Sequence, residues 1–125
     1  MMDERPFLST GSVIEDYRFL LGYMKKCKQL KEDCSSLLPT SEILSEIIKA
    51  ISEAGLSFGD IIELIRTKFE SSIDCDLCSE AFKEAYGVVV DCTEAKKLLF
   101  VQIAGWYVEI LESLGYIKVR YQWKQ

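Results

Sequence analysis

The five cysteines are the side chains of this sequence with the most obvious chemistry. Cys75 and Cys78 form a CxxC pair, which is typical of one edge of a tetrahedral zinc site or of a redox pair. Zinc would need two further thiolates from Cys27, Cys34 and Cys92. On one continuous helix Cys27 and Cys34 would lie about 10 Å apart along the axis, too far to share a metal or a disulfide. Three interpretations stay open: small core side chains, a zinc site, or a disulfide that uses the CxxC segment.

The sequence lacks the residues on which most enzymes rely. It contains no histidine, which removes Ser-His and Cys-His pairs and every imidazole metal site. Its seven glycines are scattered, so the chain has no Gly-rich phosphate loop. We therefore expect a protein that is not an enzyme, with no catalytic residue, no cofactor, no small-molecule substrate, and no metal unless Cys75 and Cys78 hold one.

Composition and charge narrow the class further. Hydrophobic residues make up 49% of the 125 positions, enough for one domain over residues 1–125 with a proper core. The net charge of −5 is uneven, because residues 32–94 carry most of the acids and both ends are net basic. The start "MMDERPFLSTG" is unlike a signal peptide, and no apolar run reaches the roughly 18 residues that span a bilayer. We expect a cytoplasmic protein with no membrane partner.

Helical periodicity dominates the chain. Apolar residues recur every three or four positions over residues 13–33, 41–55 and 57–69, and a short helix is expected over 79–87 after a polar loop. Gly55 suits a left-handed helix end, and Ser57 with Asp60 resembles a capping box. The segment 93–114 is apolar almost all round, so protein should surround it. We predict a mainly α fold: four or five helices packed on this long C-terminal helix, with a minor β element.

The last residues alternate strictly. Apolar and cationic or polar side chains take turns from position 117 to 124, which is typical of a half-buried strand with a cationic outer face. A lone strand is unstable, so we expect it to pair with a "VVV" strand at 88–90, with a second copy of the chain, or with a partner protein. Its aromatic residues are enriched at protein interfaces. The candidate interface residues are Tyr116, Tyr121 and Trp123.

The stretch "GWYVEILESLGYIKVR" resembles the last helix and first wing strand of winged-helix domains. Ile110, Leu111, Leu114, Gly115, Tyr116, Ile117 and Val119 carry the likeness. The resemblance implies sequence-specific DNA binding, for which cations at the start of the helix and in the strand would be needed. The candidate nucleic-acid-binding residues are Lys96, Lys97, Lys118, Arg120 and Lys124.

The leading functional prediction is a non-catalytic interaction or regulatory module that acts by protein-protein contact, as a homodimer or as an adaptor in a larger complex. The alternative is a DNA-binding transcriptional regulator of winged-helix type. DNA binding requires cations on one face and a steep salt dependence. The interaction hypothesis requires an exposed surface whose loss breaks an assembly and leaves the helices intact.

Overall fold

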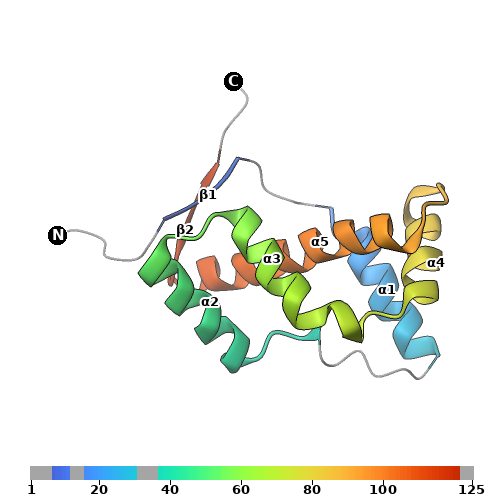
Figure 1. Ribbon diagram of the computed structural model, residues 1–125, viewed down its shortest axis with the longest axis horizontal. Helices are drawn as coiled ribbons and strands as arrows, with labels where there is room; N and C mark the ends of the chain where they lie inside the picture. The colour runs from blue at the N-terminus through green and yellow to red at the C-terminus, as the bar shows by residue number, and fades with distance from the viewer. Residues whose placement is uncertain (1–6, 12–15, 31–36, 122–125) are drawn as a thin grey trace.

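The computed structural model describes residues 7–11, 16–30 and 37–121, and in them five α-helices lie beside one short pair of strands (Figure 1). The elements in chain order are β1 (Phe7–Gly11), α1 (Arg18–Gln29), α2 (Ser41–Ala54), α3 (Phe58–Phe69), the 3-10 turn η2 (Glu70–Ser72), α4 (Cys75–Tyr86), α5 (Cys92–Ser113) and β2 (Lys118–Tyr121). The prediction of a mainly helical fold with four or five helices is confirmed.

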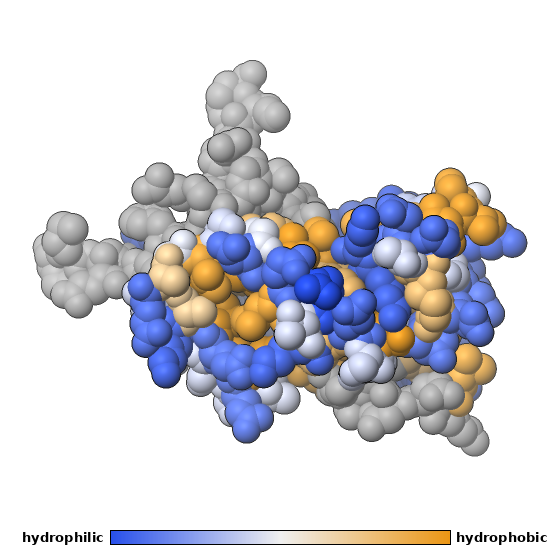
Figure 2. Space-filling model, viewed as in Figure 1, coloured by the Kyte–Doolittle hydropathy of each residue, from blue (hydrophilic) through white to orange (hydrophobic). Residues whose placement is uncertain are grey.

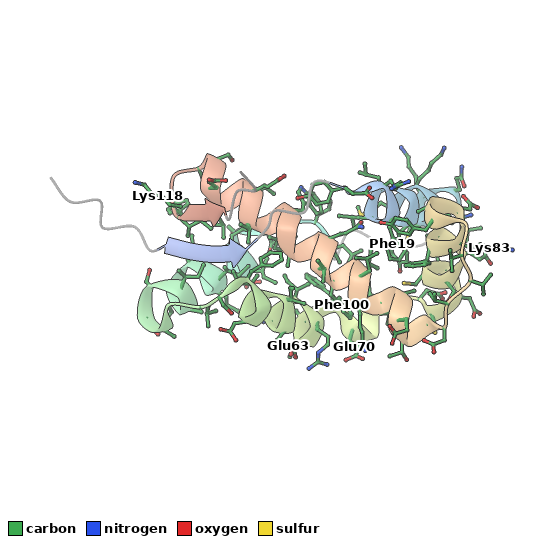
Figure 3. The ribbon with its side chains drawn as sticks, turned by 90° about the horizontal axis from the view of Figure 1, so that it is seen from above. Phe19, Glu63, Glu70, Lys83, Phe100 and Lys118 are labelled. Atoms are coloured by element: carbon green, nitrogen blue, oxygen red, sulfur yellow. A yellow bond between two sulfur atoms is a disulfide. The ribbon has the colours of Figure 1, made fainter. Side chains whose placement is uncertain are left out.

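Helix α5 is the centre of the fold. It is the longest helix, with 22 residues, and it packs against α1, α3 and α4. In Figure 3 it crosses the molecule from end to end, with Phe100 labelled near its middle. Its buried residues are Ala95, Leu99, Phe100, Gln102, Ile103, Ala104, Gly105, Tyr107, Val108 and Leu111. The expectation that protein surrounds this helix is confirmed over most of its circumference.

One polar side chain lies inside this apolar packing. Gln102 is 1% exposed, and its Oε1 accepts a 2.8 Å hydrogen bond from the backbone N–H of Leu20. Its Nε2 donates a 2.9 Å hydrogen bond to the hydroxyl of Tyr86. Leu20 lies in the first turn of α1, where backbone N–H groups have no acceptor within the helix, and the N-cap Tyr17 offers no side-chain cap. Gln102 of α5 therefore caps α1 and holds α4 at the same point.

The helical hairpin of α2 and α3 follows the sequence pattern closely. Thr40 caps α2 by accepting a hydrogen bond from the N–H of Ile43. Gly55 ends α2 at a φ of 63°, a conformation that costs glycine little. The Ser57 hydroxyl and the Asp60 carboxylate then form the complete capping box that begins α3. The predicted caps are confirmed, and they explain why so short a joint connects the two helices.

Three helix boundaries differ from the prediction. Helix α1 covers only Arg18–Gln29 within the described residues, instead of residues 13–33. Helix α4 begins at Cys75, so the predicted polar loop is wrong there, because the carboxylate of Asp74 accepts a 2.8 Å hydrogen bond from the N–H of Leu77 and starts the helix early. Asp91 does the same for α5 through the N–H of Glu94. Aspartate at these two positions is the cap that sequence reasoning passed over.

The predicted strand at residues 88–90 is wrong. These residues form the loop between α4 and α5, and Val88 and Val89 are 53% and 74% exposed. Figure 2 shows a hydrophobic group at the upper right, where Figure 1 places this loop. Three β-branched residues favour extended backbone, but none of the described residues pairs with this segment. Local propensity alone does not make a strand without a partner.

The C-terminal strand does have a partner, and it is none of the three that we expected. Strand β2 pairs in parallel with β1, with Leu8 opposite Val119 and an irregularity between Ser9 and Gly11. The described strand covers Lys118–Tyr121, and the remainder of the alternating segment after Tyr121 lies outside the described residues. Pairing between the two ends of a chain depends on how the helices between them pack, so a local pattern cannot reveal it.

The Gln102 bridge yields a stability prediction. Gln102→Leu leaves the buried N–H of Leu20 without an acceptor, and we expect the free energy of unfolding to fall by about 1–3 kcal/mol. Urea unfolding followed by circular dichroism measures this change. Tyr86→Phe is the matched variant: it removes the hydrogen bond with Gln102 and keeps the cap on α1, so its cost should be smaller. Equal midpoints for Gln102→Leu and the native chain would contradict the role of the bridge.

Candidate functional site

The structure decides the role of the CxxC segment. The sulfur of Cys75 forms a disulfide with Cys92, and the two Cα atoms lie 5.4 Å apart. This bond joins the first residue of α4 to the first residue of α5. The interpretation of a disulfide through the CxxC segment is confirmed, and a sulfur in a disulfide is no thiolate ligand for zinc. Within residues 7–11, 16–30 and 37–121, no three side chains form a group that could hold a metal ion.

Cys78 is a core residue. Its side chain is completely buried on α4 and carries a free thiol. Burial raises the pKa of this thiol to about 12, although the charge of Lys96 acts in the opposite direction. Because the thiolate is the reactive form of cysteine, this environment makes Cys78 inert at neutral pH.

Cys27 is buried on α1 and is also disulfide-bonded. Helix α1 ends at Gln29, so the distance argument that relied on one continuous helix through Cys34 does not apply. Cys34 itself lies outside the described residues.

The predicted interface residues are only partly described. Tyr116 is 48% exposed and follows Gly115, which ends the α5 region at a φ of 83°. Tyr121 belongs to β2, but its side chain lies outside the description, and so does the whole of Trp123. Tyr116 therefore remains a candidate contact.

The described cations of the predicted DNA site do not converge. Lys96 and Lys97 lie in the first turns of α5, where Lys96 donates to the backbone oxygen of Glu70 and Lys97 forms an ion pair with Glu94. Lys118 lies past the other end of α5 (Figure 3), and the helix between them is roughly 24 Å long at 1.5 Å per residue. The side chains of Arg120 and Lys124 lie outside the description. The described lysines are therefore separated along the molecule and do not form one cluster.

An apolar groove lies between α1 and α5. Its volume is about 380 Å³. It is lined by Tyr17, Leu20, Leu21 and Met24 of α1, by Leu38, and by Trp106 and Glu109 of α5. Leu21 and Leu38 are 66% and 44% exposed, so large apolar side chains open directly to solvent here.

The hollow continues along α5. A second, more open depression of about 580 Å³ shares Trp106 and Glu109 with the first and adds Ile110, Glu112 and Ser113. Trp106 and Ile110 are one helical turn apart, so they form one apolar strip on the solvent side of α5. We call the two depressions together the α1–α5 groove.

Charged residues flank the α1–α5 groove with opposite signs. Glu109 and Glu112 belong to its α5 side. On α1, Lys25 and Lys28 each follow a groove residue, Leu21 and Met24, by one turn and therefore lie beside it. Both lysines are exposed. None of these four charged side chains has an ion pair within the described part of the chain.

Lys26, unlike Lys25 and Lys28, has an ion pair within the described part of the molecule. Lys26 faces α4, where it pairs with Glu84, and the hydrogen bond to that carboxylate raises the pKa of Lys26. Helix α1 thus uses one lysine for the contact with α4 and leaves two beside the groove.

Sequence reasoning missed this groove. The buried stripe of α1 consists of Phe19, Leu20, Tyr23 and Cys27. Leu21 and Met24 continue the apolar surface beyond that stripe, which is wider than one packed neighbour requires. Trp106 belongs to a helix that is apolar all round, so the pattern gave no sign of which side stays open.

No protein family, curated protein or solved structure matches this chain. Within the described residues, no helix has the length and apolar character needed to cross a bilayer.

The environment of Cys78 predicts selective protection from alkylation. With a pKa of about 12, only about one thiol in ten thousand is ionised at pH 8. We expect iodoacetamide to leave Cys78 unmodified in the folded protein and to modify it fully in guanidinium chloride, as measured by peptide mass spectrometry. Rapid modification of Cys78 in the folded state would contradict its burial.

Proposed function

We propose that this protein is a non-catalytic interaction module that forms a homodimer through the α1–α5 groove. The observation that carries the proposal is the groove itself, an open hollow lined mainly by apolar side chains, with Glu109 and Glu112 on its α5 side. This arrangement of an apolar centre and a polar rim is typical of protein-protein contact surfaces.

The exposure of the groove residues supports the proposal. A single exposed leucine is ordinary on a protein surface. Here Leu21, Leu38, Met24 and Trp106 line one hollow together, and contiguous apolar surface of this kind marks binding sites. Burial of a leucine side chain contributes about 1.5–3 kcal/mol, so a partner that covers the groove gains from each of these residues.

The charges at the groove favour a second copy as the partner. The groove has acidic residues on its α5 side and basic residues on its α1 side. A two-fold dimer brings the same patch of both subunits together, so the acidic residues of one copy can pair with the basic residues of the other. A surface with acids alone would instead favour a basic partner of another kind. An adaptor role with a different subunit remains the alternative within this class of function.

The DNA-binding alternative has less support. Phosphate contacts require cations that face the backbone together, whereas Lys96 and Lys97 are separated from Lys118 by the length of α5. The open strip of α5 carries Glu109 and Glu112, which would repel phosphates. The winged-helix likeness also weakens, because β2 pairs with β1 from the start of the chain.

Leu21→Gln tests the proposed contact surface. Leu21 is 66% exposed, so its replacement should leave the folded monomer intact. A two-fold interface contains the residue twice, and we expect the dimer to weaken by about 2–4 kcal/mol. Light scattering across a concentration range should show twice the 14.3 kDa chain mass for the native protein and the single mass for the variant.

Val89→Gln is the matched control, since Val89 is equally apolar and 74% exposed but lies in the loop between α4 and α5. It should leave the dimer unchanged. A native chain that stays monomeric at every concentration would contradict the homodimer, and a dimer that survives Leu21→Gln would place the contact elsewhere.

A further inference from the structure

We infer that the two copies meet in one orientation, with Glu109 and Glu112 of each copy against Lys25 and Lys28 of the other. This inference rests on the proposed homodimer and adds the arrangement of its subunits. The four side chains have no ion pair within the described residues, so they are available to a partner.

The placement of the helices sets the geometry. Figure 3 shows α1 and the C-terminal half of α5 along the same upper edge of the molecule, one after the other. The apolar lining lies between them. The contact face therefore has an acidic end, an apolar middle and a basic end.

We compare the two limiting orientations of a two-fold axis in the plane of this face. An axis parallel to the line from the acidic to the basic end places glutamates against glutamates and lysines against lysines. An axis perpendicular to that line places each acidic end on a basic end and still superimposes the two apolar middles. Like charges in contact disfavour an assembly, so the second orientation is the one that the surface selects.

The roles of the two kinds of contact are different. The apolar middle, with Leu21, Met24 and Trp106, supplies most of the affinity because burial removes these side chains from water. The charged ends lie at the rim, where ion pairs stay hydrated and fix orientation more than affinity. Added salt screens the ion pairs at the rim, so it should weaken the preference for one orientation before it dissociates the dimer.

Charge reversal at each end tests the arrangement. The first variant carries Lys25→Glu with Lys28→Glu, and the second carries Glu109→Lys with Glu112→Lys. In each variant alone, both ends of the face have the same sign, and we expect homodimer formation to weaken about tenfold or more. In a 1:1 mixture, every acidic end of one variant meets a basic end of the other. We expect a heterodimer with an affinity close to that of the native homodimer.

A control separates placement from net charge. Lys49→Glu with Lys83→Glu gives the same charge change as the first variant. Both lysines are exposed on other helices, and Figure 3 shows Lys83 beside α4, at the edge of the molecule opposite the strands. This variant should dimerise as the native chain does. Circular dichroism of all three variants checks that the helices are intact.

The outcomes distinguish the inference from the proposed function. Weakened single variants and a restored mixture support the arrangement. If the native chain dimerises and Leu21→Gln dissociates it, but charge reversal has no effect or the mixture does not recover, the arrangement is wrong and the groove contact stands. If the native chain never dimerises, both are wrong.

Discussion

The structure depends on the burial of α5 between the other helices and on the hydrogen bonds that make this burial possible. A helix that is apolar nearly all round must be covered by other elements, and α1, α3 and α4 supply the cover. Its one buried polar residue, Gln102, accepts a hydrogen bond from the buried backbone N–H of Leu20 at the start of α1 and donates one to the hydroxyl of Tyr86. An unpaired amide in this position would cost more than the hydrogen bond itself contributes. Gln102, whose burial without hydrogen bonds would destabilise the core, thus fixes the positions of α1 and α4 instead.

The proposed function follows from what this packing leaves uncovered. Helix α1 uses one face for α4 and α5, and its remaining apolar residues, Leu21 and Met24, lie beside Trp106 in an open groove. The disulfide between Cys75 and Cys92 ties α4 to α5, and α1 packs against both of these helices, so the two helices that present the groove belong to one packed framework. A preorganised apolar surface loses little conformational entropy on association, which suits an interaction module.

The sequence predicted those features that depend on local chemistry. The capping box at Ser57, the left-handed Gly55 and the enclosed α5 were all readable from residue type and spacing. Features that depend on contacts between distant parts of the chain were not predicted. The partner of β2 is β1, at the other end of the chain, and the valines at 88–90 stay in a loop because no strand adjoins them within the described residues. The α1–α5 groove combines residues from three separate segments, so no single periodicity could reveal it. The role of Gln102 was also not predicted, although a lone amide in an apolar helix is a signal of a buried hydrogen bond.

The most direct test of the account asks which surfaces of two copies touch. Copies labelled with ¹⁵N and unlabelled copies are mixed in equal amounts and treated with a carbodiimide, which joins a lysine amine to a carboxylate in direct contact. Peptide mass spectrometry then identifies the linked pairs. We expect links of mixed isotope between Lys25 or Lys28 of one copy and Glu109 or Glu112 of the other. Mixed links that join other surfaces, with none at the α1–α5 groove, would contradict this expectation.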